Sequence, residues 1–255
     1  MTEVLIVRSS IAPLCAEARA GSEQVSQALA GHRLEPVAEC GMWVRARTAD
    51  GYEGWVHRGY VESLGAREAA SRFATGRVSL GCTVTEIDGR RRALPLGAVL
   101  ADDAYVEHGT ALAPEQLLAR FPCTPGGITR TALEFFEGTS YQWGGITPWG
   151  ADCSGLVQTT FALHGIRLPR DARLQAEYGQ PVEGGLDALH AADLLFFSDR
   201  EDGRITHVAI ALHQRRIVHL AIGRGGYAVE RLDDEGDPYV RGLVGRFRFA
   251  RRVIA

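Results

Sequence analysis

The order of structural patterns in residues 123–255 is the strongest constraint on the fold. Apolar residues recur at helical spacing first, over residues 129–137, after Cys153 and over residues 171–178. Alternating patterns follow and predict strands at residues 193–197, 205–212, 216–222, 227–231 and 247–253. Helices followed by strands predict an α+β domain with an antiparallel sheet.

The N-terminal part has the pattern of two small all-β domains. In residues 1–66, the hairpin WVRARTADGYEGWV, with SQALAGHRLEPV upstream, resembles bacterial SH3-like domains. Such domains bind peptides or cell-wall fragments, or only pack against a neighbour. Residues 67–122 alternate around an Asp88-Gly89 turn and predict a second barrel of the same kind, followed by a helix at residues 114–120.

A linker is predicted where breakers cluster, at Pro122, Pro125, Gly126 and Gly127. We therefore expect domains at residues 1–66, 67–122 and 123–255.

Composition excludes several partners. The formal net charge of −3 gives no reason to expect nucleic acid or an anionic membrane surface. The N-terminus, MTEVLIVRSS, is not a signal peptide, and no apolar run reaches the length of a membrane span, so we expect a cytoplasmic protein.

The 5 cysteines are widely spaced without a CxxC pair, which argues against a disulfide framework or a zinc site. No metal or organic cofactor is implied, and the oligomeric state is left open.

Cys153 is the candidate nucleophile. A glycine-rich loop precedes it, and Asp152 stands where a helix N-cap is expected, so Cys153 falls in the first helical turn. The helix dipole and the free N–H groups there favour the thiolate, which is the nucleophilic form. A buried structural cysteine is the alternative.

A cysteine hydrolase also needs a base and a group that orients it. His207 and His219 lie in one predicted hairpin. A loop of three or five residues between the strands places both rings on one face, about 7–8 Å apart at Cα. A four-residue loop places them on opposite faces and excludes the catalytic interpretation. Satisfied core histidines are the alternative.

These residues belong to a wider set of motifs. YQWGG, DCSGLVQ, GIRLPRDA, Gln175, ADLLFF and THVAIAL followed by IVH resemble, in order and spacing, the NlpC-type cell-wall cysteine peptidases. The resemblance covers nearly all of residues 127–225 and implies a papain-like catalytic domain. Two SH3-like domains before it resemble the γ-D-glutamyl-L-diamino-acid endopeptidases that process murein peptides.

The resemblance also implies roles for catalytic residues. Cys153 would be the nucleophile, His207 the general base and later acid, and His219 the orienting member. Tyr141 matches the family tyrosine near the oxyanion, where the Cys153 backbone N–H could be the other donor.

Further positions would bind substrate. Asp152 and Ser154 match positions that hold the free amine of an N-terminal L-alanine, and Asp171 lines the same pocket. Trp143 and Tyr60 are candidates for substrate contact, and the first barrel would close the subsites on the amine side. The alternatives are loop packing for Tyr141 and Trp143 and packing for Tyr60. Asp152 and Asp171 could serve only as helix caps, and Ser154 could simply be a tolerated residue.

The function implied is a cytoplasmic cysteine peptidase for cell-wall peptide recycling. It would cut the γ-D-glutamyl–diamino-acid bond of murein peptides with a free N-terminal L-alanine. Two alternatives are an amidase or acyl transferase on the same fold, and a catalytically silent wall-binding module.

Overall fold

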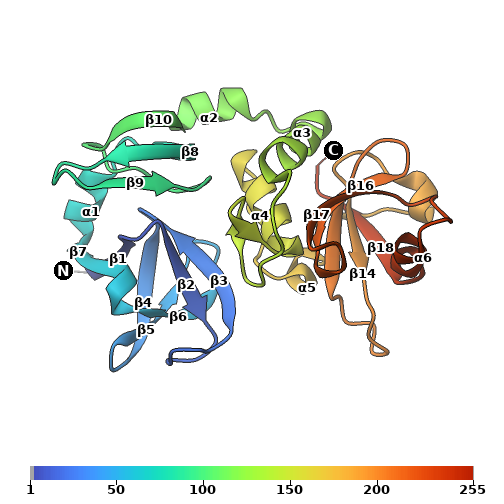
Figure 1. The fold of residues 1–255 in the computed structure, drawn as a ribbon, viewed down its shortest axis with the longest axis horizontal. Coiled ribbons are helices and arrows are strands. Elements are labelled where there is room, and N and C mark those ends of the chain that lie inside the picture. Colours follow the sequence, from blue (N-terminus) through green and yellow to red (C-terminus); the bar gives the residue numbers. More distant parts are fainter. Residues whose placement is uncertain (1–2, 255) are drawn as a thin grey trace. The chain divides into compact units, whose positions relative to one another are not determined.

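The computed structural model describes residues 3–254 and has two compact units, Met1–Arg120 and Phe121–Ala255. We call them the N-terminal unit and the C-terminal unit (Figure 1). The sheets of both units are antiparallel, and the larger helices lie in the C-terminal unit, which confirms the predicted α+β class with an N-terminal region built mainly of strands. Over residues 3–254, no helix combines the length and the apolar character needed to cross a membrane.

The N-terminal unit begins with a seven-stranded sheet in the order β3-β2-β6-β5-β4-β1-β7. Its core is apolar and includes Leu5, Leu14, Leu34, Val44 and Val56. The predicted hairpin is confirmed, because β5 and β6 pair directly. The strands are β1 (Glu3–Val7), β2 (Ile11–Cys15), β3 (Gln24–Leu29), β4 (Arg33–Cys40), β5 (Trp43–Arg47), β6 (Glu53–His57) and β7 (Val61–Gly65).

The rest of this unit is a three-stranded sheet in the order β10-β8-β9, framed by two helices. Its elements are α1 (Ala66–Arg72), β8 (Val78–Thr85), β9 (Arg91–Leu94), β10 (Tyr105–Leu112) and α2 (Pro114–Arg120). It meets the first sheet at Gly31, where a Cβ would lie 2.1 Å from the carbonyl oxygen of Val99. The Val99 N–H donates to the Ala30 carbonyl at 2.8 Å. A domain of its own over residues 67–122 stays a prediction.

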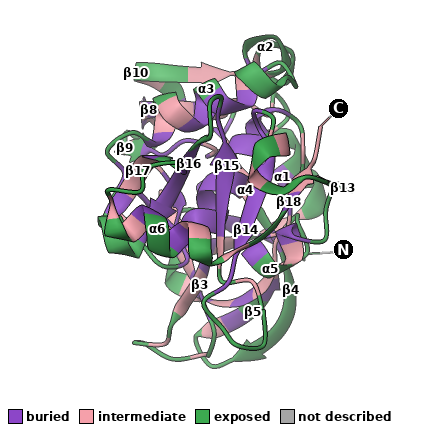
Figure 2. Ribbon diagram, turned by 90° about the vertical axis from the view of Figure 1, so that its right-hand side faces the viewer, coloured by how far each residue is buried: buried purple, intermediate pink, exposed green. Residues whose placement is uncertain are grey.

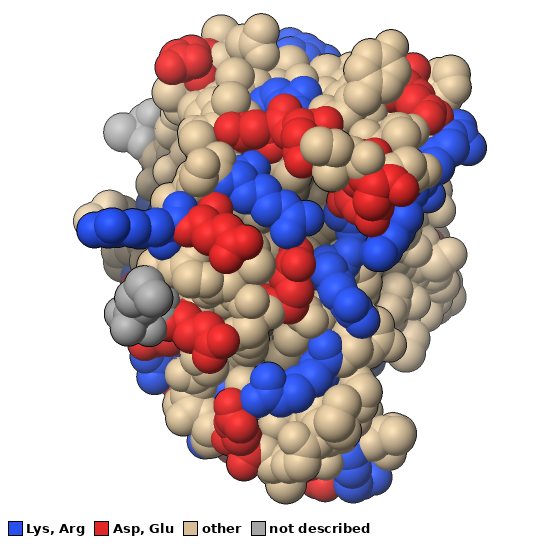
Figure 3. Space-filling view, turned by 90° about the vertical axis from the view of Figure 1, so that its left-hand side faces the viewer, with Lys and Arg blue, Asp and Glu red and all other residues tan. Residues whose placement is uncertain are grey.

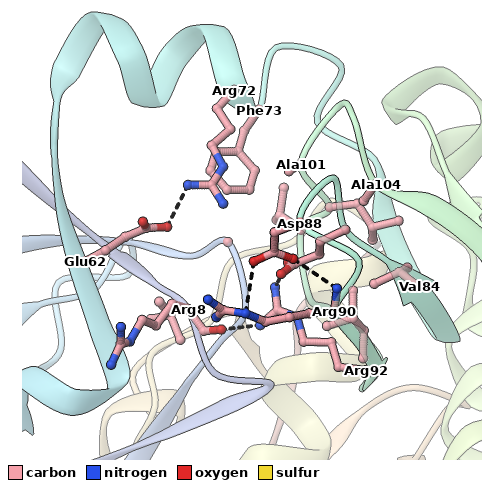
Figure 4. A pocket seen from close by; sticks show the side chains of 16 residues that line it. Arg8, Glu62, Arg72, Phe73, Val84, Asp88, Arg90, Arg92, Ala101 and Ala104 are labelled. Carbon is pink, nitrogen blue, oxygen red and sulfur yellow. Dashed lines mark hydrogen bonds and ion pairs between the residues drawn. The ribbon is translucent and has the colours of Figure 1, made fainter.

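A cavity of about 160 Å³ lies between these two sheets (Figure 4). Its charged lining consists of Arg8, Arg72, Arg90 and Arg92 with Glu62, Glu86 and Asp88. Arg72 pairs with Glu62 at 2.7 Å, Arg90 pairs with Asp88 at 2.9 Å, and Arg92 pairs with Glu86. The carboxylates therefore offset most of the arginine charge. The candidate catalytic residues do not line this cavity.

Arginine supplies all 28 basic residues of the chain. Figure 3 shows arginine and acidic side chains interleaved over one face of the molecule, without a large patch of one sign. That face therefore offers no extended basic surface to a polyanion.

The C-terminal unit is built on a six-stranded sheet in the order β13-β18-β14-β15-β16-β17. Figure 2 shows buried residues concentrated on α4, β14, β15 and β16. The helices are α3 (Pro125–Phe136), α4 (Cys153–Leu163), α5 (Ala172–Gln175) and α6 (Pro238–Gly245). The strands are β11 (Ile146–Thr147), β12 (Gly150–Ala151), β13 (Gln180–Pro181), β14 (Leu194–Phe197), β15 (His207–Ala211), β16 (Arg216–Ala221), β17 (Gly226–Arg231) and β18 (Phe247–Arg252).

Two local predictions are corrected. The predicted linker at Pro125, Gly126 and Gly127 is instead the first turn of α3. Thr124 caps that helix by accepting a hydrogen bond from the Gly127 N–H at 3.1 Å, and proline is favourable at the first helical position. The helix predicted at residues 171–178 is shorter, because α5 ends at Gln175.

Candidate active site

Asp152 organises the start of α4. Its Oδ1 accepts a hydrogen bond from the Gly155 N–H at 2.8 Å, which confirms the predicted N-cap. Its Oδ2 accepts one from the Gly144 N–H at 2.9 Å, so the same carboxylate holds the glycine-rich loop. The loop and helix approach so closely that a Cβ on Gly155 would lie 2.1 Å from the carbonyl oxygen of Gly145. Only glycine fits there.

Arg170 forms a buried ion pair with this cap. Its two terminal nitrogens lie 2.6 Å from Oδ2 and 3.0 Å from Oδ1 of Asp152. The two side chains are only 2% and 8% exposed. The nitrogen that contacts Oδ2 also donates to the carbonyl of Gly145. The nitrogen that contacts Oδ1 also donates to Ser154 Oγ at 2.8 Å. Such a bidentate pair fixes the position of both partners.

Cys153 is the first residue of α4 and is 7% exposed. Burial raises the pKa of its thiol to about 12, and the negative charge of Asp152 acts in the same direction. Three groups lower this pKa, namely the Val208 N–H, the Arg170 charge and the Ser154 N–H. Their combined effect is smaller than the rise caused by burial and Asp152. Burial therefore favours the neutral thiol and acts against the helix dipole, which favours the thiolate.

The hydrogen bond from Val208 also locates the thiol. Val208 directly follows His207 on β15, so the sulfur lies at the beginning of that strand. The nucleophile candidate and the base candidate thus come from adjoining points of α4 and β15.

The hairpin that carries the two histidines has the odd register. Ile210 pairs with Val218 and Ala211 with Ile217, which leaves residues 213–215 as the loop. His207 and His219 consequently lie on one face as diagonal neighbours, and the prediction of a shared face is confirmed. His207 Nε2 and His219 Nδ1 are 2.8 Å apart, a hydrogen-bond distance.

His207 has the electrostatic character of a proton acceptor. Burial, the neighbouring His219 and the positive charge of Arg246 lower the pKa of His207 below its ordinary value. Its imidazole is therefore neutral at neutral pH and can take a proton. A neutral thiol beside a neutral imidazole is the resting state that these directions describe.

That resting state predicts how Cys153 reacts with iodoacetamide. Because the thiol pKa is raised to about 12, the thiolate fraction at neutral pH is small. We expect the alkylation rate of Cys153 to rise about tenfold per pH unit between pH 6 and 9. Mass spectrometry of tryptic peptides measures it, with the exposed Cys40 and Cys123 as internal references. A rate independent of pH over this range would show a preformed thiolate instead.

The other predicted residues have different settings. Tyr141 is half-buried, and burial raises the pKa of its hydroxyl. Electrostatic interactions with Cys153 and Asp152 add to this rise, so the hydroxyl lies near both of these groups. Trp143 is 59% exposed in the glycine-rich loop. Ser154 is buried, and its hydroxyl donates to Asp152 Oδ1 at 3.1 Å.

Asp171 and Tyr60 are the two remaining residues that were predicted to contact substrate. Asp171 occupies the N-cap position of α5, and among the described residues its side chain makes no capping hydrogen bond. Tyr60 lies in the N-terminal unit, in a short 3₁₀ turn (Arg58–Tyr60), and is 37% exposed. Substrate contact by either residue stays a prediction.

Sequence reasoning assigned no role to three side chains that support the site. Arg170 pairs with Asp152, as described above. Gln175 is fully buried and its side-chain nitrogen donates to the Ser154 carbonyl at 3.0 Å. Glu230, on β17, lies 3.7 Å from His219 Nε2. Arg170 lies within the quoted GIRLPRDA motif and Gln175 is itself a quoted motif position, whereas no local pattern marks Glu230.

Comparisons with known proteins agree with this architecture. Residues 138–237 match the NlpC/P60 family, and residues 4–62 match the bacterial SH3 domain. The gamma-D-glutamyl-L-lysine dipeptidyl-peptidase of Bacillus subtilis (strain 168) is 28% identical over 221 residues, which cover 76% of this chain and 71% of that protein. Dipeptidyl-peptidase 6 of Lysinibacillus sphaericus is 37% identical over 117 residues, covering 46% of this chain and 40% of that protein. The chain thus spans less than half the length of the second relative.

Solved structures show the same fold. An NlpC/P60 family protein from Bacillus cereus ATCC 10987 superposes with a TM-score of 0.81 at 19% identity, covering 99% of this chain and 100% of that one. An NlpC/P60 endopeptidase from Photobacterium damselae subsp. piscicida gives a TM-score of 0.66 at 15% identity, over 97% of this chain and 70% of that one. Residues 138–237 therefore form an NlpC/P60 domain, and residues 4–62 form a bacterial SH3 domain.

Proposed function

We propose that this protein is a cysteine peptidase that cuts cell-wall peptides at the γ-D-glutamyl–diamino-acid bond, in substrates with a free N-terminal L-alanine. The observation that carries the proposal is the pair of diagonal histidines, 2.8 Å apart, beside the Cys153 end of α4. The name of the relative in Bacillus subtilis, a gamma-D-glutamyl-L-lysine dipeptidyl-peptidase, supports the choice of bond. A role in recycling such peptides inside the cell is part of the same proposal.

Acylation begins from the neutral pair. The Cys153 sulfur attacks the γ-carbonyl carbon of D-glutamate while His207 takes the thiol proton. The oxyanion forms near the Cys153 N–H, which has no partner within the helix, and near the Tyr141 hydroxyl. His207 then gives its proton to the nitrogen of the diamino acid. The C–N bond breaks, the amine leaves, and a thioester remains on Cys153.

Deacylation reverses the roles. Water attacks the thioester carbon and His207 takes the water proton. The C–S bond breaks, the sulfur recovers a proton from His207, and the carboxylic acid of the L-Ala-γ-D-Glu product is released. Throughout both steps, the hydrogen bond between His207 and His219 keeps the ring in one orientation.

Recognition of the free amine is the most demanding part of the proposal. Asp152 already accepts hydrogen bonds from Gly144, Gly155, Ser154 and Arg170. A carboxylate offers roughly four lone-pair sites, so an incoming ammonium has to displace one of these partners. The Ser154 hydroxyl is the most readily turned of the four. We therefore propose that the ammonium takes the place of that hydroxyl on Asp152.

A pair of peptides tests the function. We expect L-Ala-γ-D-Glu-diaminopimelate to be cleaved, with products that sum to the substrate plus one water in mass spectrometry. The N-acetylated peptide should be cleaved about 100-fold more slowly or not at all, because it carries no ammonium to pair with a buried carboxylate.

The same assay distinguishes the alternative functions. Equal cleavage of both peptides would refute the free-amine requirement, and cleavage of neither would refute the peptidase. Added glycine ester distinguishes hydrolysis from acyl transfer, since a transferase would yield an aminolysis product. A parallel peptide ending in L-lysine shows which diamino acid the enzyme accepts.

A further inference from the structure

Three side chains form a diagonal row across neighbouring strands of the C-terminal sheet. His207 is on β15, His219 on β16 and Glu230 on β17. Because Ile217 pairs with Glu230, and Ile217 and His219 are two residues apart, Glu230 and His219 share a face. The row thus runs from the nucleophile end of β15 to a buried carboxylate.

The contacts along this row restrict where protons can be. His207 Nε2 and His219 Nδ1 lie 2.8 Å apart, so one of the two nitrogens carries the hydrogen and the other accepts it. If His207 is to take a proton on Nδ1, its Nε2 must already be the N–H donor. His219 Nδ1 must then accept, and the hydrogen of His219 must be on Nε2.

That required hydrogen points toward Glu230. His219 is fully buried, and among residues 3–254 its Nε2 has no hydrogen-bond partner within normal distance. Glu230 Oε1 lies 3.7 Å away, longer than a hydrogen bond and within ion-pair range. Glu230 itself is only 7% exposed. A movement of under about 1 Å completes the bond.

We propose that Glu230 is a positioning residue that holds His219 as the Nε2–H tautomer and so leaves Nδ1 of His207 free to act as the base. Glu230 acts through His219 and touches neither substrate nor sulfur. The inference rests on the proposed function for its catalytic consequence, whereas the tautomers themselves can be observed without substrate.

The other charged groups around the row fit this assignment. Arg224 makes a bidentate ion pair with Glu230, at 2.7 and 3.1 Å, and also contacts Asp237. From the α6 side, the Tyr239 ring packs against His219 with centroids 6.2 Å apart, and the positive charge of Arg246 acts on His207. His219 and Arg224 hold the pKa of Glu230 below its usual range, so Glu230 is the ionised acid of the row.

The test compares Glu230→Leu and Glu230→Gln in the full chain. Nitrogen-15 NMR of histidine-labelled protein at pH 7 should show both rings as Nε2–H in the native protein. In Glu230→Leu we expect His219 to lose the Nε2–H preference and kcat for the γ-D-glutamyl peptide to fall about 100-fold. Glu230→Gln keeps an acceptor oxygen, so it should retain the tautomers and lose less kcat.

A pH profile separates positioning from a merely structural role. Loss of the negative charge in Glu230→Gln disfavours the imidazolium, so the acid limb of the kcat profile should move to lower pH. The inference would be overturned if a folded Glu230→Leu protein kept the native histidine tautomers. It would also be overturned if the acid limb of the kcat profile stayed at its native pH in both variants. Altered tautomers in a protein whose native form cleaves no peptide would refute the proposed function and leave the positioning role supported.

Discussion

We expect Cys153→Ala to abolish hydrolysis of L-Ala-γ-D-Glu-diaminopimelate, with kcat lower by about 10⁴-fold or more. The substitution removes the atom that attacks the carbonyl, and the histidine pair cannot replace it. Alanine also suits a buried helix start, because Cys153 is 7% exposed and Asp152, not Cys153, makes the cap. The measurement is single-turnover release of the diamino acid, followed by mass spectrometry.

A matched variant controls for the loss of any thiol. Cys123→Ala removes an exposed cysteine from the same unit and should leave kcat unchanged. The double variant Cys153→Ala with His207→Ala should be no slower than Cys153→Ala alone, because the two groups act in one step. Full activity in Cys153→Ala would remove this cysteine from the mechanism.

Local patterns in the sequence predict much of the C-terminal unit. The strands at β14 to β18 begin and end within two residues of the predicted positions, because their alternation and bounding breakers are strong. The helix at residues 114–120 has the predicted bounds. The α6 helix was not predicted, although Asp237 caps it by accepting from the Tyr239 N–H at 2.8 Å and Pro238 opens it.

Whether His207 and His219 share a face of the sheet depends on one feature, the odd or even number of residues in the loop between their strands. Sequence alone could not decide between a four-residue loop and an odd one. The positive φ angles of Gln214 and Arg215, 59° and 55°, form the compact turn that gives the odd register. Neither residue is a glycine, so the usual signal for such a turn is absent.

Partners from distant parts of the chain escaped prediction for a physical reason. Arg170 follows a proline in a loop, where an arginine is ordinarily solvated. Its burial depends on how that loop meets the start of α4. Glu230 depends likewise on the register between β16 and β17, which one sequence does not specify. Charged groups of this kind are fixed by tertiary packing.

The second large effect is expected from the buried ion pair beneath Cys153. Arg170→Met should destabilise the C-terminal unit by about 3–5 kcal/mol, because it leaves the Asp152 carboxylate buried without its counter-charge. The side chains are 2% and 8% exposed, so water cannot replace the guanidinium without rearrangement. Native-state hydrogen exchange of the α4 amides measures the opening free energy of this unit within the full chain.

An exposed pair provides the matched control. Arg200 and Asp202 form an ion pair in which each side chain is 53% exposed, so Arg200→Met should leave α4 exchange unchanged. Adding Asp152→Asn to Arg170→Met should recover part of the loss, because the neutral amide can still cap the helix. The same carboxylate raises the pKa of Cys153 and Arg170 lowers it, so Arg170→Met should also slow alkylation of Cys153 at pH 8. Unchanged exchange and alkylation in Arg170→Met would show that Asp152 does not need this counter-charge.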